Sequence, residues 1–240
     1  ASAGESWDDF VKMTVERGLW GLENLSYIPG TVGAAPIQNI GAYGRQVSDP
    51  IEYVEVFDKN EMTIKKISNY DCGLAYRTSI FKKPEGKRYI VIGISFLLSE
   101  KQNPMISHSD IKNFFSGKDS NLVSVKEIRT AIIEIRKSKL PGLKELGSAG
   151  SFFKNPVVDG AVLEGLKTKF PDIVYSKEKS LKYKLSAVYL IDHIGGWKGY
   201  RKGDAGGYDK HALVLVNHGR ATSQEIFSLA SQIQRDVYKK

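Results

Sequence analysis

The segment between residues 28 and 44, IPGTVGAAPIQNIGAYG, constrains the fold more than any other part of the chain. It contains no charged residue, and its apolar residues follow neither the period of a helix nor the alternation of a strand. A loop in solvent is normally more polar, and glycine allows a backbone to approach another group closely. Two interpretations stay open: a tightly packed structural loop, or a loop whose N–H groups and amides meet a flat or phosphorylated ligand. It does not match the G-x-G-x-x-G fingerprint.

The overall composition places the chain among folded proteins of the reducing cytoplasm. Its 240 residues suit one large domain or two ordinary ones, and 41% are hydrophobic. No apolar run approaches the roughly 20 residues that span a bilayer, and the start lacks the features of a signal peptide. The single cysteine, Cys72, cannot form an internal disulfide and is interpreted as a small buried hydrophobe. The net charge of +8 is dispersed, which disfavours nucleic acid as the partner.

Hydrophobic periodicity predicts a series of helices and strands in two parts. In the first part we expect a helix within 5–20 that ends at Gly18, a hairpin of strands 51–58 and 62–68, a strand at 88–98 buried on both faces, and a helix at 125–137. The breaker at 139–142 is the predicted domain boundary. In the second part we expect a loop at 147–156, helices near 159–169 and 185–194, a strand at 212–217, and a helix at 222–238 capped by Thr222 or Ser223.

Two polar residues stand out because their surroundings are apolar. Ser151 lies between Gly150 and two phenylalanines; its ordinary interpretation is a turn or cap residue, and no acid or histidine can be assigned to it as a hydrolase triad. Arg77 is costly to bury unless it pairs with a carboxylate, a phosphate or a developing negative charge, and the alternative is a surface arginine whose stem packs on a strand. The four histidines show no metal-ligand spacing, so no metal site is predicted.

Seven segments of the chain carry a further signal when they are taken together: AGESW (3–7), GLENLSYIPGTVGAAPIQNIGAYG (21–44), AYRTSIFK (75–82), RKSKLP (136–141), AGSFFKNP (149–156), KLSAVYLID (184–192) and HALVLVN (211–217). Together they resemble one family, the UDP-N-acetylenolpyruvoylglucosamine reductases (UDP-N-acetylmuramate dehydrogenases). They occur in the family's order across essentially the whole chain, and the insertion at 99–121 resembles the type I branch.

The resemblance implies an α+β protein with FAD bound in the fold of the vanillyl-alcohol-oxidase-type flavoproteins. Residues 1–139 would form an FAD-binding domain and 140–240 a smaller α/β substrate-binding domain. NADPH would reduce the flavin, and UDP-N-acetylglucosamine enolpyruvate would then be reduced to UDP-N-acetylmuramate, a step of peptidoglycan precursor synthesis. The protein is expected to be a cytoplasmic monomer without nucleic-acid or membrane partners.

The resemblance also implies a role for individual residues. Ser151 matches the family's proton donor, and Arg77 matches the arginine that stabilises the developing charge. The cofactor-binding residues carried over from the family are Gly30, Thr31, Val32, Gly33, Ala34, Gln38, Asn39 and Gly41. The substrate-binding residues carried over are Tyr43, Tyr76, Arg136, Lys139, Asn155, Tyr175, Lys198 and His211.

The chain also departs from the family pattern. Nothing in it corresponds to the family's N-terminal Gly-Ser-Asn loop or to its C-terminal Leu-Glu-Pro-Glu segment. We therefore expect this chain alone to bind FAD weakly and to have little reductase activity. His108 stands where the type I loop usually presents a tyrosine, Gly142 replaces an aspartate, and Val188-Tyr189 replaces Gly-Trp. The alternatives are a non-catalytic remnant that binds a UDP-sugar, and another flavoprotein of the superfamily, which would lack the AGSFFKNP segment.

Overall fold

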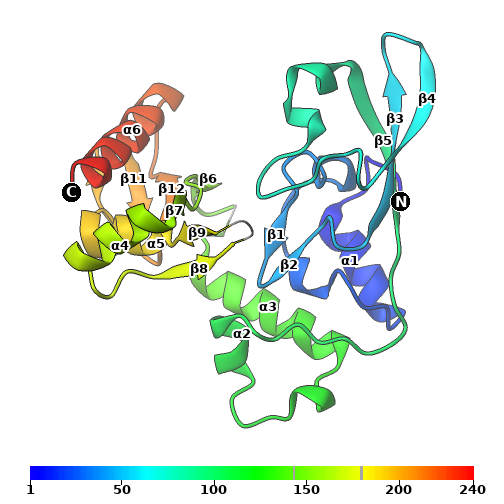
Figure 1. Ribbon diagram of the computed structural model, residues 1–240, viewed down its shortest axis with the longest axis horizontal. Helices are drawn as coiled ribbons and strands as arrows, with labels where there is room; N and C mark the ends of the chain where they lie inside the picture. The colour runs from blue at the N-terminus through cyan, green and yellow to red at the C-terminus, as the bar shows by residue number, and fades with distance from the viewer. Residues whose placement is uncertain (143, 179–180) are drawn as a thin grey trace. The chain divides into compact units, whose positions relative to one another are not determined.

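The computed structural model describes residues 1–142, 144–178 and 181–240, which form two compact units, 1–136 and 137–240. Figure 1 shows their elements in order of colour along the chain. The strand pairings of the described residues are antiparallel, and helices and strands are mixed in both units. The predicted α+β class is therefore confirmed. None of the helices in the described residues is long and apolar enough to cross a membrane.

The first unit contains two main helices and one three-stranded sheet. Its principal elements are α1 (Trp7–Glu16), β1 (Gly41–Ala42), β2 (Arg45–Gln46), β3 (Ile51–Asp58), β4 (Thr63–Ser68), β5 (Tyr89–Phe96), α2 (Ser109–Phe114) and α3 (Val125–Lys139). Short 3₁₀ turns lie between them at η1 (Glu23–Leu25), η2 (Val32–Ala34), η3 (Ile80–Lys82), η4 (Pro84–Arg88) and η5 (Ser120–Leu122). The sheet order is β4-β3-β5.

The core of this unit lies between α1, α3 and the sheet. The apolar stripes predicted for both helices are buried, including Trp7 and Val11 of α1 and Ile128 and Ile132 of α3. The indole of Trp7 also donates a hydrogen bond of 2.9 Å to the carbonyl of Leu25, which fixes η1 to α1. Gly18 follows α1 with φ +75°, a left-handed conformation that ends a helix at low cost, as predicted.

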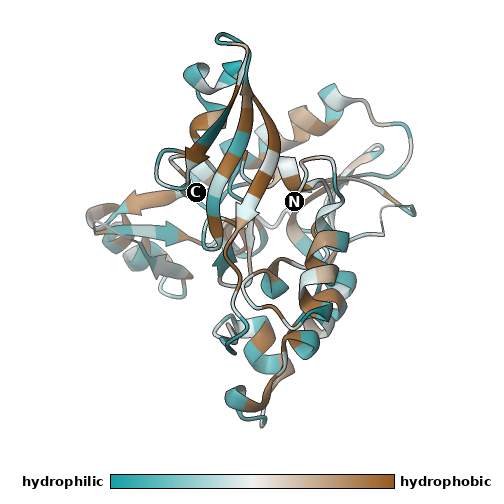
Figure 2. Ribbon diagram, turned by 90° about the vertical axis from the view of Figure 1, so that its right-hand side faces the viewer, coloured by the Kyte–Doolittle hydropathy of each residue, from teal (hydrophilic) through white to brown (hydrophobic). Residues whose placement is uncertain are grey.

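The hairpin β3–β4 and the strand β5 form as predicted, but the expectation that β5 is buried on both faces is wrong. Figure 2 shows hydrophilic residues interleaved with hydrophobic ones along these strands. Strand β5 lies at the edge of the sheet and is only partly covered, with Ile90 50% exposed. Its outer edge is paired with the first residues of the chain, where Ile94 N–H donates to the Ala1 carbonyl at 3.0 Å. A run of apolar residues cannot by itself distinguish a central strand from such an edge strand.

The described residues of the second unit form two small sheets, each packed against one helix. Its elements are β6 (Gly147–Ser151), β7 (Val157–Asp159), α4 (Gly160–Lys169), β8 (Tyr175–Lys177), β9 (Lys182–Leu185), α5 (Ala187–Tyr189), the π-helix η6 (Leu190–Gly195), β10 (Arg201–Lys202), β11 (Ala205–Tyr208), β12 (His211–Asn217) and α6 (Ser223–Lys239). The sheet β10-β11-β12-β6 packs on α6, and the sheet β7-β9-β8 packs on α4.

Four predictions in this unit are confirmed and two are corrected. Helices α4 and α6 and strand β12 form where periodicity placed them. Thr222 is the cap of α6, in a reciprocal capping box with Glu225. The predicted loop at 147–156 instead begins with β6, and the predicted helix at 185–194 consists of the single turn α5 followed by the π-helix. The glycine-rich sequence GSAGS carries no strand signal, because its pairing depends on the neighbouring β12.

The ion pair between Asp8 and Arg129 joins α1 to α3 and yields a testable pH dependence. Both guanidinium nitrogens donate to the carboxylate, at 2.7 and 2.9 Å, and the Arg129 side chain is only 11% exposed. Burial acts to raise the pKa of Asp8, but the hydrogen bonds from Arg129 and from the Tyr27 N–H together lower it below 3.8. The stabilisation is thus fully present well above pH 3.8 and is lost progressively as the pH falls below 3.8 and through the lowered pKa.

We expect Asp8→Asn to reduce the free energy of unfolding at pH 7 by about 1–2 kcal/mol. Urea unfolding at several pH values measures this loss, and the difference from the wild type should shrink as the carboxylate becomes protonated. Asp9→Asn is the matched control, because Asp9 is the exposed neighbour on the same helix. A difference that stayed constant down to pH 2 would contradict the assignment.

The thiol of Cys72 should be inert in the folded protein. The residue is fully buried, as predicted, and burial together with the nearby Asp71 raises the pKa of the thiol to about 11. At pH 8 only about 0.1% would be thiolate, the form that reacts. We expect a disulfide reagent to label no thiol at pH 8 until denaturant is added. Rapid labelling of the native protein would show that the region opens.

Candidate functional site

The segment 28–44 is held against the first residues of the chain by main-chain hydrogen bonds. Val32 N–H donates to the Glu5 carbonyl and Gly33 N–H donates to the Ala3 carbonyl, both at 2.9 Å. A Cβ at Gly33 would lie 2.6 Å from the Cβ of Ala3, so the close approach requires glycine at this position. Val32 is fully buried. This half of the segment therefore fits the interpretation as a packed structural loop.

The same segment also presents an uncharged rim to solvent. Gly30, Thr31, Ala34 and Gln38 are exposed, and Gly30 has φ +119° with open space where a side chain would be. Among the residues that the structure describes, the N–H groups of Gly30, Thr31 and Gln38 donate to no protein acceptor. The rim therefore offers main-chain donors without charge, which suits close contact with a flat or phosphorylated group.

Asn39 is buried and its side chain is used inside the protein. Its amide donates to the Gln46 side chain and to the Ala75 carbonyl, both at 3.1 Å, and its oxygen accepts from Ser48 N–H at 3.0 Å. The residue is 1% exposed and has φ +45°. Asn39 thus links three segments of the unit, and its N–H donates to the Pro36 carbonyl at 3.2 Å, so it supports the loop from within the protein.

Arg77 is half-buried and is held by hydrogen bonds to the main chain of this loop. It occupies the tight turn between Ala75 and Thr78 with φ +54°, a conformation that costs a non-glycine residue about 1–2 kcal/mol. Its guanidinium donates to the carbonyls of Asn39 at 3.1 Å and of Gly41 at 2.6 Å, and it lies 5.3 Å from the ring of Tyr76. These contacts exclude the interpretation as a surface arginine. A guanidinium has five N–H donors, so the remaining ones can hold an anion.

A second group of predicted residues gathers where α3 meets the Tyr43 turn. Tyr43 and Arg136 share a side-chain hydrogen bond, and Arg136 Nε donates to the Tyr27 carbonyl at 3.0 Å. Burial raises the pKa of Tyr43, while the positive charge of Arg136 opposes the shift. Burial likewise lowers the pKa of Arg136 from its usual value. A half-buried cation beside a phenol is a suitable environment for a carboxylate or phosphate ligand.

Sequence reasoning missed Asn24, which is fully buried beside this group. Its amide nitrogen donates to the Tyr43 carbonyl and to the Met105 carbonyl, both at 2.8 Å. The available signal was a polar pair, Glu23-Asn24, at the start of an otherwise uncharged segment. Periodicity could not reveal it, because a single buried amide has no period.

In the second unit, Ser151 ends the edge strand β6 and is exposed. The register advances by two residues on β12, from Val214 to Val216, and by three on β6, from Ser151 back to Ser148. The extra residue is accommodated by a bulge in which Gly150 has φ +65°. Bulges of this kind redirect a side chain and are common beside active sites. The exposed Ser151 hydroxyl is therefore set by a local backbone irregularity.

The other predicted residues of this unit lie on separate elements. Asn155 accepts the Ala187 N–H at 2.9 Å at the start of α5, and Lys198 pairs with Asp192 of the π-helix at 3.4 Å. Tyr175 is 43% exposed on β8. His211 begins β12 and Lys139 ends α3. Arg77 and Ser151 belong to different units, and each is described within its own unit.

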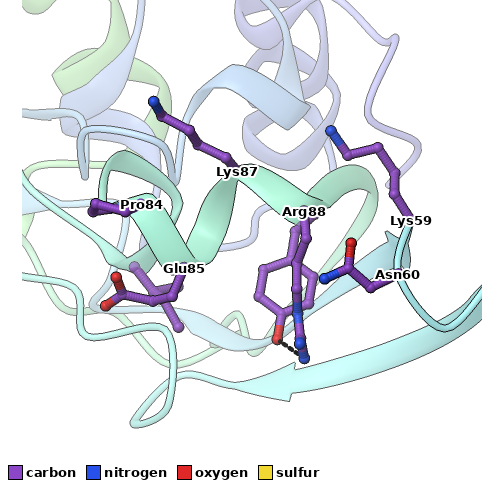
Figure 3. A pocket seen from close by; sticks show the side chains of 8 residues that line it. Lys59, Asn60, Pro84, Glu85, Lys87 and Arg88 are labelled. Atoms are coloured by element: carbon purple, nitrogen blue, oxygen red, sulfur yellow. Dashed lines mark hydrogen bonds between the residues drawn. The ribbon is translucent and has the colours of Figure 1, made fainter.

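A cavity elsewhere in the first unit does not coincide with these residues. About 600 Å³ opens between the β3–β4 turn and η4, and Figure 3 shows Lys59, Lys87 and Arg88 at its wall. Arg88 is already engaged, with Tyr89 at 2.9 Å and Asp58 at 3.1 Å. None of the predicted site residues lines this cavity. In the part of the chain that the structure describes, no three His, Cys, Asp or Glu side chains form a group that could hold a metal ion.

Comparison with known proteins matches a family model to part of each unit. Residues 142–240 match the C-terminal domain of UDP-N-acetylenolpyruvoylglucosamine reductase, and residues 1–66 match an FAD binding domain. The reductase of Bdellovibrio bacteriovorus is 45% identical over 99% of this chain and 70% of its own length. That of Pseudomonas aeruginosa is 42% identical over the whole chain and 70% of its own length.

A solved structure is similar over nearly the whole chain as well. The UDP-N-acetylenolpyruvylglucosamine reductase of Thermus caldophilus superposes with a TM-score of 0.66 at 27% sequence identity, covering 98% of this chain and 67% of that chain. Both the predicted family and the predicted fold are confirmed. The chain belongs to the UDP-N-acetylenolpyruvoylglucosamine reductase family and is a flavin-dependent oxidoreductase whose cofactor is FAD.

Proposed function

We propose that this protein reduces UDP-N-acetylglucosamine enolpyruvate to UDP-N-acetylmuramate, with NADPH as reductant and FAD as cofactor, in cytoplasmic peptidoglycan precursor synthesis. Family membership supports the reaction class, and one observation carries the proposal for this chain. Arg77 is held in a strained turn by two carbonyls of the 28–44 segment and retains donors for an anion. Strain of this kind persists where the surroundings enforce it, and it is concentrated at functional sites.

The residues of the first unit fit FAD. The exposed Gly30, Thr31, Ala34 and Gln38 form an uncharged rim with main-chain donors, and a side chain at Gly41 would lie 3.2 Å from the Arg77 guanidinium. We assign the cofactor to this rim, and residues 32, 33 and 39, whose N–H groups donate to the Glu5, Ala3 and Pro36 carbonyls, hold the loop in place behind it. When bound and reduced by NADPH, the flavin would supply a hydride to the enol-ether carbon β to the substrate carboxylate. Residues 1–139 are proposed as the FAD-binding domain and 140–240 as the substrate-binding domain.

Ser151 is proposed as the proton donor. As the substrate carbon β to the carboxylate receives hydride, negative charge develops on the α carbon and its carboxylate. The Ser151 hydroxyl gives its proton to the α carbon, and the serine oxygen then recovers a proton from water. A serine is a weak acid, but a strongly basic carbanion needs a well-placed donor more than an acidic one. The exposed hydroxyl after the β6 bulge suits this role.

Arg77 is proposed to stabilise the negative charge that develops in this step. Its guanidinium is already oriented by Asn39 and Gly41, so little reorganisation is needed when charge appears. Tyr43 is partly buried and lies beside the cation of Arg136, so the two residues are suitable partners for an anionic part of the substrate. The remaining proposed substrate residues are Tyr76, Lys139, Asn155, Tyr175, Lys198 and His211. The net charge of +8 favours the approach of a diphosphate and a carboxylate.

Replacing Arg77 by lysine should slow the reaction of the substrate but not the reduction of flavin. A lysine ammonium is one point charge and cannot keep both carbonyl contacts while holding an anion. We expect flavin reoxidation by the enolpyruvyl substrate to fall about 100- to 1000-fold. Stopped-flow absorbance of the chain with excess FAD separates the two half-reactions. The matched control is Arg88→Lys, because the Arg88 guanidinium also lies over a tyrosine ring, 4.8 Å from the centre of the Tyr89 ring. Equal slowing of flavin reoxidation in the two variants would refute the proposed role of Arg77 in stabilising charge.

Ser151→Ala tests the proton donor and the proposed reaction together. We expect flavin reduction by NADPH at the wild-type rate and reoxidation by the enolpyruvyl substrate at least about 100-fold slower. Ser228→Ala, an exposed serine of α6, should behave as the wild type. Equal slowing of both half-reactions would show that the serine is not the donor. A wild-type chain that binds the nucleotide but no flavin would instead support the non-catalytic alternative.

A further inference from the structure

Tyr43 occupies a strained two-residue turn between β1 and β2. Tyr43 has φ +50° and Gly44 has φ +88°, which is the pattern of a type I′ turn. The first central position of this turn is normally taken by Asn, Asp or Gly, because other side chains tolerate a positive φ poorly. The main chain of Tyr43 must therefore be held by its surroundings, and the contacts that hold it determine where its ring lies.

Asn24 supplies such a contact from inside the unit. Its side-chain nitrogen donates to the carbonyl of Tyr43 at 2.8 Å and to the carbonyl of Met105 at 2.8 Å. The two bonds reach across 19 and 81 residues of sequence from one fully buried side chain. One amide therefore ties the Tyr43 turn to the 99–121 insertion.

The insertion runs along this turn and contacts its successive residues. Arg45 donates to the Asn103 carbonyl at 3.0 Å, and a Cβ on Gly44 would lie 3.2 Å from the Met105 side chain. The ring of His108 packs edge-on against that of Tyr43, with centroids 5.0 Å apart. Arg45 thus contacts Asn103, Gly44 lies beside Met105, and Tyr43 packs on His108. The Asn24 bridge lies at the middle of this contact.

We propose that Asn24 is a positioning residue for the nucleotide substrate. It holds Tyr43 where its side chain meets Arg136, and it fixes residues 103–108 along the same turn. Because Tyr43 and Arg136 are assigned to the substrate, this inference rests on the proposed function. Asn24 itself is buried and acts through Tyr43 and the insertion.

Asn24→Asp removes both donors while keeping the shape of the side chain. An ionised aspartate would repel both carbonyls, and a protonated one could hold only one of them. In the full chain we expect hydrogen exchange to accelerate about fivefold or more in peptides covering 41–46 and 103–108, the size expected for a lost hydrogen bond. Unchanged exchange in both peptides would overturn the bridge as the element that holds the insertion. This measurement requires neither FAD nor activity.

The matched control is Asn69→Asp. The Asn69 amide also donates to two carbonyls, those of Ser48 at 2.7 Å and Ile51 at 2.6 Å, but it contacts neither the Tyr43 turn nor the insertion. We expect it to destabilise the fold without accelerating exchange in 103–108. Should Asn24→Asp fail to fold, Asn24→Ser keeps one donor and should give a smaller change in the same peptides.

Calorimetry of the chain with UDP-N-acetylglucosamine enolpyruvate and, separately, with FAD distinguishes positioning from a general loss of stability. We expect Asn24→Asp to weaken nucleotide binding about five- to tenfold and to leave FAD binding unchanged. Equal weakening for both ligands, or the same nucleotide effect in Asn69→Asp, would overturn the positioning role. If the wild type bound no nucleotide, the proposed function would fail and the substrate role with it, while the exchange data would still judge the bridge.

Discussion

The candidate site of the first unit depends on the hydrogen bonds made by the side chain of Asn39. An uncharged, glycine-rich segment has little intrinsic preference for one conformation, and its entropy of ordering must be offset by specific bonds. Asn39 provides them, since its amide joins Gln46, Ala75 and Ser48, and its carbonyl receives Arg77. The loop and the arginine turn are therefore positioned by the same residue. If Asn39 moved, the rim proposed for FAD and the guanidinium proposed for the substrate would move together.

Sequence patterns predict the helices that bury one apolar face against the core. They miss the elements that form only because they pair with another strand. Helices α1 and α3 were predicted because each carries a continuous apolar stripe toward the core, and α6 because its capping box is a local signal. Strand β6 has no such stripe, and only its pairing with β12 makes it a strand. Strand β5 is apolar enough for a central position, but the chain's own first residues cover its edge. No local pattern contains that information.

The site divides in the same way. The composition of the uncharged segment predicted that its backbone approaches another group closely. A Cβ at Gly33 would lie only 2.6 Å from the Cβ of Ala3, so part of the segment is a packed structural loop. The roles of Arg77 and Ser151 came from the family resemblance, because a lone arginine and a lone serine have ordinary structural explanations. Asn39 was carried over as a cofactor contact, yet its side chain is fully occupied within the protein. The sequence gives almost no signal for Asn24, because its side chain acts by donating to the main-chain carbonyls of Tyr43 and Met105, which are distant along the chain.

Backbone strain gives these observations a common physical basis. Four non-glycine residues of the first unit's site, Tyr27, Asn39, Tyr43 and Arg77, have positive φ. The conformation costs the two tyrosines and the arginine about 1–2 kcal/mol each, and it costs asparagine less. All four take part in hydrogen bonds with other segments: Tyr27 with Asp8 and Arg136, Asn39 with Gln46, Ala75 and Ser48, Tyr43 with Asn24, and Arg77 with the carbonyls of Asn39 and Gly41. A left-handed residue points its side chain in a direction that a relaxed backbone would not give. The buried polar network is thus what keeps the phenol of Tyr43 and the guanidinium of Arg77 oriented before any ligand arrives.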